Sequence, residues 1–276
     1  MPETKESRVP SGSMAVRLIA IDLDGTLLMR SGFPHPENVA AIAEARAAGI
    51  YVVLASGRVQ TSVRYYAKLV GIEQPMVCCN GADAVWTDGR EILHRRLDPG
   101  CVREIIDTAR QDGIHASIYT RDRVIFLQEG AWAERYRERV KHVEPESLLP
   151  ENLDDLDVSK VLLMTEASRV AGLRELFAAK LDQSLVHTTE SEPEYLEFLP
   201  KGADKGSALA VVAESLGIQQ AECAAIGDYL NDLEMVRWAG IGGAMENAHP
   251  TLKEAADAVW GHHENAGVAE FIRAIM

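Results

Sequence analysis

The sequence predicts an α/β protein with a mostly parallel sheet and an inserted α+β lobe. Short apolar runs alternate with amphipathic helical segments from residue 16, a rhythm typical of βαβ units. Between residues 84 and 198 the pattern changes to hairpins, and after residue 204 the first rhythm resumes. The chain has 276 residues, which exceeds a typical single domain of ~100–200 residues. We therefore expect one α/β domain that is interrupted by a second lobe.

The first half of the α/β domain is predicted over residues 14–83. Residues 1–13 are mostly polar and resemble an expression tag or a disordered arm, so they are excluded from the predicted fold. A helix over 36–48 has Val39 and Ile42 at helical spacing and Gly49 at its end. The elements expected here, in order, are a strand at 17–21, that helix, a strand at 50–54, a helix at 60–70 and a strand at 76–79.

The inserted lobe is predicted over residues 84–198. Segments 84–86 and 91–94 flank Asp88 and Gly89, a dipeptide that favours a tight turn between antiparallel strands. We assign this hairpin to the lobe. The other elements expected in the lobe are a helix at 99–111, a hairpin within 117–128, a helix at 131–140, a strand at 160–165, a helix at 168–181 and strands at 185–188 and 195–198.

The second half of the α/β domain is predicted over residues 199–276. The alternation of apolar runs and helical segments returns there, so both halves should contribute strands to one parallel sheet. The expected elements are a helix at 205–216, a strand at 223–226, a helix at 232–239, a strand at 241–244 and a terminal helix at 268–275.

Composition and charge argue against several functional classes. Lys and Arg number 28 against 42 Asp and Glu, and the net charge of −14 makes a nucleic-acid or anionic membrane surface unexpected. The sequence lacks an apolar run of about eighteen residues and the layout of a secretory signal, which predicts a cytoplasmic protein.

The oligomeric state of the protein, monomer or homodimer, is left open. The four cysteines lack the paired spacing of a zinc site, so we expect reduced thiols.

Polar residues gather where the predicted parallel strands end. Ligands bind beyond the carboxyl ends of the strands in an open parallel sheet, so these residues should converge. They are Asp22, Asp24 and Thr26 after the first strand, Ser56, Gly57 and Arg58 after the second, Asn80 and Gly81 after the third, and Asp228, Asn231 and Asp232 after the strand that follows the lobe.

These residue types suit the hydrolysis of phosphate monoesters. The uncatalysed reaction is so slow that enzymes reach accelerations of up to ~10²¹-fold, so several catalytic effects must combine. Asp22 is the candidate nucleophile, because a carboxylate can split the reaction into formation and hydrolysis of an aspartyl phosphate. Asp24 is the candidate acid and base, which would protonate the leaving oxygen and then activate water.

A hard cation would relieve the repulsion between the nucleophilic carboxylate and the phosphate. Mg²⁺ prefers oxygen ligands, and we expect Asp22, Asp228 and a carbonyl oxygen near Asp24 to supply them, with Asp232 orienting a bound water. Lys205, at the start of a predicted helix, is the main candidate for binding the phosphate. The other candidates for that role are Thr26, Ser56, Gly57, Arg58 and Asn231.

Structural alternatives exist for most of these residues. Asp228 and Asp232 could cap the following helix, and Lys201 could replace Lys205 as the functional lysine. Arg58 could pair with an acid instead of a phosphate. Asn80 could simply favour a turn, and the sequence assigns no role to Asn247, which follows an acidic residue.

The motifs together resemble those of the haloacid dehalogenase superfamily and, within it, the Cof-type hydrolases. The resemblance covers residues 16–276 and rests on the stretches 19–28, 54–58, 201–206 and 226–232, with similar C-terminal segments at 244–248 and 265–269. Ser56 stands where many relatives carry threonine, which keeps the hydroxyl, and Glu246 stands where glycine is frequent.

The resemblance implies a Rossmann-like three-layer α/β/α core and a mobile cap inserted between the second and third motifs. It also implies a Mg²⁺-dependent phosphatase that acts on a small phosphorylated metabolite, such as a sugar phosphate, with Lys205 binding the phosphate. Two other functions stay open: phosphoryl transfer of the phosphohexomutase kind, and a non-catalytic regulator that binds magnesium or phosphate. The presence of both Asp22 and Asp24 argues against the regulator, because a binding protein needs no acid or base.

Overall fold

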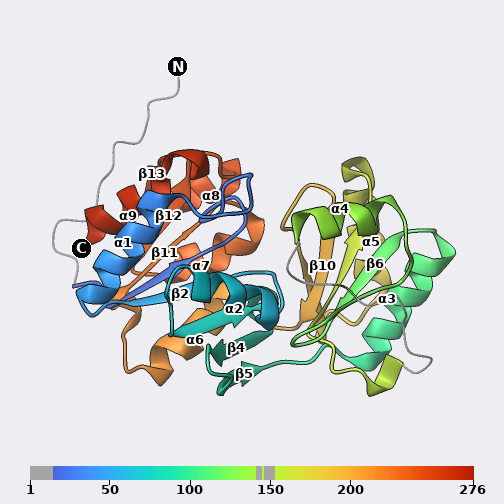
Figure 1. Ribbon diagram of the computed structural model, residues 1–276. Coiled ribbons are helices and arrows are strands. Elements are labelled where there is room, and N and C mark those ends of the chain that lie inside the picture. Colours follow the sequence, from blue (N-terminus) through green and yellow to red (C-terminus); the bar gives the residue numbers. More distant parts are fainter. Residues whose placement is uncertain (1–14, 141–144, 146–152) are drawn as a thin grey trace.

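The computed structural model describes residues 15–140, 145 and 153–276, which form two lobes side by side (Figure 1). The predicted arm at residues 1–13 lies outside the described residues. β1 (Leu18–Ile21) is buried along its whole length in an eight-stranded sheet with the order β13-β12-β11-β1-β2-β3-β4-β5. The other strands of this sheet are β2 (Tyr51–Ala55), β3 (Pro75–Cys78), β4 (Asp83–Trp86), β5 (Glu91–His94), β11 (Cys223–Gly227), β12 (Ile241–Met245) and β13 (Ala258–Trp260).

The strands from β13 to β3 run parallel, which confirms the predicted mostly parallel α/β core. The strand order advances from β1 to β3 on one side and from β11 to β13 on the other, so right-handed crossovers place the connecting helices on opposite faces. Contacts between α1 and α9, and between α6 and α7, agree with these two layers. The helices are α1 (Pro36–Ala47), α2 (Gln60–Leu69), α6 (Lys205–Ser215), α7 (Leu233–Trp238), α8 (Pro250–Ala255) and α9 (Gly267–Ile275).

The hairpin of β4 and β5 corrects the predicted boundary of the inserted lobe. We expected the lobe to begin at residue 84, but β4 pairs antiparallel with β3, and β5 pairs with β4, so both extend the large sheet. Ala84 and Val85 are buried in the large core cluster, which explains why the hairpin docks there. The sequence of a tight turn predicts that the two strands beside it pair with each other. Which sheet the pair joins depends on where its apolar side chains become buried.

The inserted lobe contains a five-stranded antiparallel sheet with the order β7-β6-β8-β10-β9. Its strands are β6 (His115–Tyr119), β7 (Val124–Phe126), β8 (Lys160–Met164), β9 (Val186–Thr189) and β10 (Tyr195–Pro200). Its helices are α3 (Pro99–Gln111), α4 (Ala131–Arg139) and α5 (Ala167–Lys180). The predicted elements are therefore present, and β10 runs two residues beyond the expected end of the lobe.

The two faces of this second sheet have different partners, because side chains alternate along a strand. On β8, Val161 and Leu163 join the cluster that contains α3 and α5. Leu162 and Met164 point the other way and belong to a second cluster, which contains residues of α4 as well as Val59 and Cys79 of the larger lobe. One face of the second sheet therefore packs against α3 and α5, and the other faces α4 and the larger lobe.

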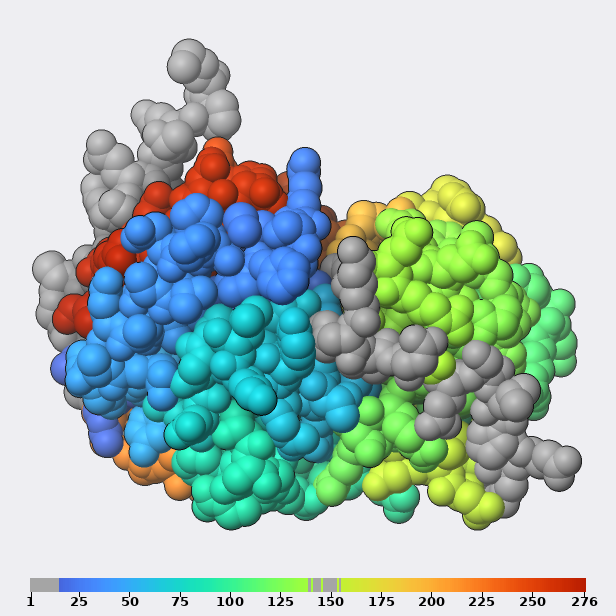
Figure 2. Space-filling model, in the orientation of Figure 1, coloured from blue at the N-terminus to red at the C-terminus, as the bar shows by residue number. Residues whose placement is uncertain are grey.

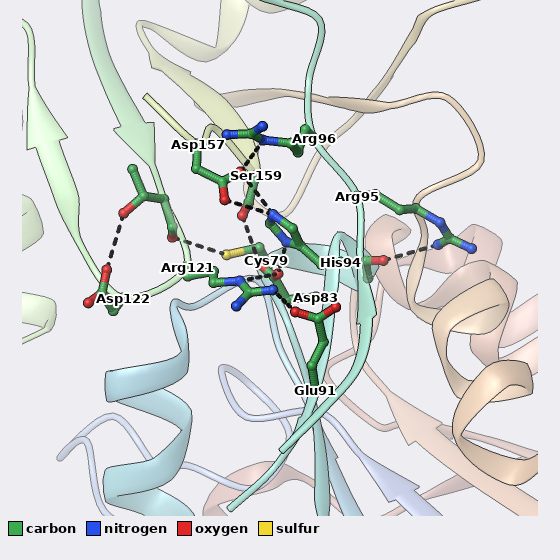
Figure 3. A network of polar contacts seen from close by, with 12 residues as sticks. Cys79, Asp83, Glu91, His94, Arg95, Arg96, Arg121, Asp122, Asp157 and Ser159 are labelled. Atoms are coloured by element: carbon green, nitrogen blue, oxygen red, sulfur yellow. Dashed lines mark hydrogen bonds and ion pairs between the residues drawn. The ribbon is translucent and has the colours of Figure 1, made fainter. Parts of the chain in front are cut away.

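A network of polar contacts joins the lobes beside the chain crossing after β5 (Figure 3). His94 lies between two carboxylates, with Nδ1 2.6 Å from Oδ1 of the fully buried Asp83 and Nε2 2.8 Å from Oδ1 of Asp157. Ser159 donates a hydrogen bond of 2.7 Å to the second oxygen of Asp83. Arg121 pairs with Glu91, and its backbone carbonyl accepts from the N–H that begins α2. The space-filling view shows the two lobes in contact, with cyan residues of the larger lobe beside green residues of the inserted lobe (Figure 2).

The described residues of the chain include no helix that is both long enough and apolar enough to cross a bilayer. All four cysteines are buried and free, in agreement with the predicted reduced thiols. Burial raises the pKa of the Cys78 and Cys79 thiols well above their usual value.

Candidate active site

The loop after β1 brings Asp22 to the carboxyl end of the large sheet. The backbone turns sharply because Leu27 N–H and Leu28 N–H donate back to the carbonyls of Asp22 and Leu23. Gly25 makes this turn with φ of +80°, and a Cβ atom there would lie 2.3 Å from Oδ2 of Asp228. Glycine is therefore required at position 25, both for the backbone conformation and for the approach of the Asp228 carboxylate.

Three carboxylates meet at this position. Asp22, Asp228 and Asp232 each present one oxygen, and these oxygens lie within 4.8 Å of one another. The Nζ atom of Lys205 lies 2.6 Å from Asp22 Oδ1 and 2.6 Å from Asp232 Oδ1. Lys205 is fully buried at the start of α6, whereas the alternative Lys201 is exposed, so Lys205 is the lysine that reaches the site.

Asp232 also fixes the loop that carries Asp228. Its Oδ2 accepts hydrogen bonds of 2.9 and 3.0 Å from the backbone N–H groups of Asp228 and Tyr229. Asp232 stands at the N-cap of α7 but makes no side-chain capping bond to that helix, so the predicted capping role is not seen there: one of its oxygens binds the preceding loop and the other faces Lys205. Both contacts coexist because a carboxylate accepts through two oxygens.

Burial and mutual repulsion dominate the electrostatics of the cluster. Burial and the neighbouring Asp232 raise the pKa of Asp22 to about 7, and the attraction of Lys205 offsets this only in part. Burial, followed by Asp22, also raises the pKa of Asp228 well above its usual value. The two carboxylates hold the pKa of Lys205 above its ordinary value, although burial alone would lower it.

The charges of the site fit a divalent cation. With all four ionised, the carboxylates of Asp24 and the cluster exceed the charges of Lys205 and Arg58 by two, an excess that a divalent cation would neutralise. The three clustered oxygens are the hard ligands that Mg²⁺ prefers. The Asp24 carboxylate lies outside this cluster and is held by Arg58, so a contribution from Asp24 to a metal would have to come from its backbone carbonyl, as expected from the sequence.

Arg58 binds Asp24 through both arms of its guanidinium. Nε and Nη2 donate hydrogen bonds of 2.7 Å each to the two oxygens of Asp24, and Nη1 donates to Ser62. Arg58 is buried, and its guanidinium also lies 5.2 Å from the centre of the Tyr66 ring. Burial lowers the pKa of Arg58, but the Asp24 carboxylate outweighs it and raises the value. The predicted alternative, an ion pair with an acid, is the contact that the structure shows.

The remaining predicted phosphate ligands lie at the same edge of the sheet. Thr26 donates a hydrogen bond of 3.2 Å to Asp228, and Ser56 accepts one of 3.3 Å from the N–H of Arg58. A cavity of about 70 Å³ lies beside Ser56, whereas Thr26 is fully buried and does not line it. It is lined by Asp22, Asp24, Ser56, Gly57, Arg58, Asp228 and Asn231 of the larger lobe, together with residues of the inserted lobe.

A polar bridge between the lobes was missed by the sequence analysis. Asn80, in the left-handed conformation with φ of 52°, donates to Glu197 over 2.8 Å and accepts from Asn231 over 3.0 Å. Glu197 also accepts from the buried Lys160 and from Ser191. In the sequence, Lys160 and Glu197 are charged residues within the apolar strands β8 and β10. They are 37 residues apart, and no pattern in the sequence indicates that they pair.

Asn247 and His263 fix the catalytic loop from its other side. Asn247 donates a hydrogen bond of 2.8 Å to the carbonyl of Gly25 and accepts one of 3.1 Å from the N–H of His263. The His263 ring lies 3.2 Å from the same carbonyl. Both residues therefore support the turn that presents Asp22, a role that the sequence left unassigned.

Comparisons with known proteins extend over nearly the whole chain. A sequence profile described as haloacid dehalogenase-like hydrolase matches residues 19–272. The chain is 29% identical over 259 residues to the 5-amino-6-(5-phospho-D-ribitylamino)uracil phosphatase YcsE of Bacillus subtilis, covering 94% of this chain and 95% of that protein. It is also 29% identical over 295 residues to phosphatase YwpJ of the same organism, covering 95% and 100%.

A solved structure shares the fold. A haloacid dehalogenase-like hydrolase from Bacteroides thetaiotaomicron superposes with a TM-score of 0.83 at 28% identity, over 95% of this chain and 100% of that one. The similarity thus includes both lobes and not only the parallel core.

Proposed function

Since this chain belongs to the haloacid dehalogenase-like hydrolases and is a phosphoric monoester hydrolase, we propose that it hydrolyses small phosphate monoesters with Asp22 as nucleophile and Mg²⁺ as cofactor. One observation carries the proposal. Asp22 lines the smaller cavity, contacts Lys205 and contributes to the cluster of carboxylate oxygens, all within 4.8 Å of one another, that it forms with Asp228 and Asp232. A carboxylate in this position can meet a phosphate group in the cavity while Lys205 holds it in place.

In the first step, a carboxylate oxygen of Asp22 attacks phosphorus and the bond to the leaving oxygen breaks. Asp24 gives its proton to that oxygen, so the alcohol departs neutral. In the second step, Asp24 takes a proton from water, and the water oxygen displaces Asp22 from the aspartyl phosphate. Arg58 donates to both oxygens of Asp24 and to Ser62, which uses three of its five N–H donors and orients the carboxyl group. We therefore propose that the role of Arg58 is to position the carboxyl group of Asp24.

The transferred phosphoryl group needs positive charge and hydrogen-bond donors. Lys205 supplies a buried ammonium, while Ser56 and Asn231 line the same cavity and carry donors. Asp22, Asp228 and Asp232 would hold Mg²⁺, which when bound supplies positive charge against the phosphate oxygens. Asp228 is positioned for this by Thr26 and by the Asp232 loop.

The substrate class that we propose is phosphorylated sugars or related metabolites. The B. subtilis relative named above is a phosphatase of a 5-phospho-D-ribityl compound, which is a phosphate monoester of a sugar alcohol.

The test is phosphate release from a panel of sugar phosphates and p-nitrophenyl phosphate, with and without Mg²⁺. We expect Asp22→Asn to abolish Mg²⁺-dependent turnover, since no nucleophile remains, and Asp24→Asn to stay folded but to slow both steps. Unchanged turnover in Asp22→Asn would refute the nucleophile. Isomerisation that requires a bisphosphate, with negligible phosphate release, would favour phosphoryl transfer of the mutase kind instead.

A further inference from the structure

Two cavities meet at Asp24. The smaller one, of about 70 Å³, contains Asp22 and its partners. The larger one, of about 510 Å³, is lined among the described residues by the loop 28–33, by α2 and by His263, and it does not reach Asp22. Asp24 and Arg58 line both cavities. These two residues therefore form the wall that the cavities share.

The mechanism divides a substrate between the two cavities. The phosphoryl group must contact Asp22, so it occupies the smaller cavity. At about 70 Å³ that cavity has about one seventh of the volume of the larger one, so an alcohol of several carbons has more room in the larger cavity. The leaving oxygen must face the acid Asp24, whose other side opens on the larger cavity.

The ceiling of the smaller cavity offers little for recognising an alcohol. Its charged pair, Lys160 and Glu197, is buried and internally satisfied: Glu197 accepts from Lys160, from Asn80 and from Ser191. The Lys160 ammonium also lies 4.2 Å from the centre of the Tyr119 ring. A hydroxyl group of a substrate would have to displace these contacts, so recognition of the alcohol is expected elsewhere.

The residues that line the larger cavity are suited to binding a planar ring. Leu28, Met29 and Phe33 contribute apolar surface, and Tyr65 and Tyr66 contribute aromatic rings. Phe33 is 52% exposed and Tyr65 is 41% exposed, although most large apolar side chains of the described residues are buried. Exposed rings that line a cavity of this volume, which lies within the range of ~300–1,000 Å³ for ligand sites, favour stacking against a planar partner.

The walls of this cavity are fixed before any ligand binds. Met29 N–H donates to the carbonyl of Phe33 over 3.0 Å, which closes the loop, and the Tyr66 hydroxyl donates to the carbonyl of Gly32 over 3.2 Å. Glu264 accepts from the N–H of Arg30 over 2.6 Å. The loop is thus held from α2 and from the segment before α9, and little ordering would be required on binding.

We propose that the larger cavity binds the leaving alcohol, and that the substrate is a phosphate monoester whose alcohol carries a planar aromatic or heteroaromatic ring stacked on Phe33 and Tyr65. This inference rests on the proposed phosphatase activity and narrows its substrate class. The ring need not be charged, because the cavity wall carries one positive residue, Arg30, and one negative residue, Glu138.

The experiment compares benzyl phosphate with cyclohexylmethyl phosphate. Both release an unactivated primary alcohol of similar bulk, so the ratio of their kcat/KM values reports the contribution of a planar ring. We expect wild-type protein to prefer benzyl phosphate by about 3- to 10-fold, the range that aromatic pairs contribute. Phe33→Leu and Tyr65→Leu keep apolar surface but remove the ring, and each should bring this ratio toward one.

Leu69→Ala is the matched control. Leu69 lies on α2 with Tyr65, is 44% exposed and does not line the cavity, so the ratio should stay at the wild-type value. Phosphate release from both esters at a ratio of one, or a preference that survives in both ring variants, would overturn the inference and leave the phosphatase intact. Release from no ester would instead overturn the proposed function.

Calorimetric binding of benzylphosphonate and cyclohexylmethylphosphonate tests the cavity without turnover. These compounds cannot be hydrolysed, so their affinities do not depend on Asp22 chemistry. Tighter binding of benzylphosphonate that is lost in Phe33→Leu and Tyr65→Leu supports the ring site, and equal binding of the two compounds by wild-type protein rejects it.

Discussion

Asp22 and Asp24 are two residues apart but lie in different environments. Asp22 is buried between Lys205 and two further carboxylates, whereas the Asp24 side chain is 26% exposed and is paired with Arg58. A nucleophile benefits from a fixed position, and an acid and base must exchange protons with solvent or substrate. The two local environments are therefore consistent with the two roles proposed from their spacing.

Arg58→Lys distinguishes positioning of Asp24 from binding of phosphate. Lysine keeps the charge but cannot donate to both carboxylate oxygens, so the orientation of Asp24 should be lost. We expect kcat to fall by about 10- to 100-fold while KM changes little, because a misplaced acid loses part of the ~10²–10⁴-fold that general acid and base catalysis contributes. Steady-state kinetics on p-nitrophenyl phosphate measures both constants.

The exposed Arg273 provides the control for this substitution. Arg273 also pairs with carboxylates, Glu37 and Glu44, but lies on α9 away from the site, so Arg273→Lys should leave both constants unchanged. A rise in KM for Arg58→Lys with an unchanged kcat would contradict the positioning role and restore Arg58 as a phosphate ligand.

At the scale of elements, alternation along β8 and β10 brings a charged pair to the face of the inserted sheet that meets the larger lobe. Lys160 and Glu197 point toward the site, while Val161 and Phe198 point into the lobe's own core. One strand thus serves both a hydrophobic core and a polar interface, because its side chains have a period of two. Glu197 also contacts Asn80, so this pair connects the lobes.

Glu197→Gln tests the energy of this buried pair. The substitution leaves the Lys160 ammonium buried without its counter-charge, and we expect the free energy of unfolding to fall by ~2–4 kcal/mol. Glu104→Gln breaks the exposed pair with Lys180 in the same lobe and should cost only ~0–1 kcal/mol. Urea unfolding of both variants gives the comparison, and equal losses would contradict the argument from burial.

At the scale of the whole molecule, the carboxylate cluster opposes folding when no cation is bound. The pKa of Asp22 is raised from 3.8 to about 7, so between these values the folded protein binds more protons than the unfolded chain. Stability from this group is fully present below pH 4 and is lost as pH rises through 7. A cation that binds the folded protein should reverse this loss.

We predict that Asp22→Asn is more stable than wild type in EDTA at pH 7.5, by ~1–3 kcal/mol, and that the difference disappears near pH 4.5. Asparagine removes one of the repelling charges but can still accept from Lys205. Saturating Mg²⁺ should reverse the order at pH 7.5, since the variant has lost a ligand. Urea unfolding at the two pH values measures this, and a wild-type protein that is equally stable with EDTA and Mg²⁺ would contradict a metal at the cluster.

Much of the fold followed from local patterns. The helix over 99–111 and the strands around 160–164 and 223–227 lie within two residues of their predicted limits, because hydrophobic periodicity over that length is distinctive. Two elements were not predicted: α8 has six residues and β13 has three, which is too short for a period to show. The sheet that receives the hairpin of β4 and β5 was predicted wrongly, since strand pairing is local but docking is not.

The sequence by itself determined which residues meet at the catalytic edge. Their positions just after parallel strands force Asp22, Ser56 and Asp228 to one end of the sheet, whatever their side chains do. Only the tertiary structure decided their contacts: Arg58 with Asp24, Lys205 between Asp22 and Asp232, and Asn80 with Glu197. The backbone topology follows from short-range patterns of apolar residues. The partner of a charged or polar side chain is instead the group that the fold brings within about 3 Å of it, and here that group is often more than a hundred residues away in the chain.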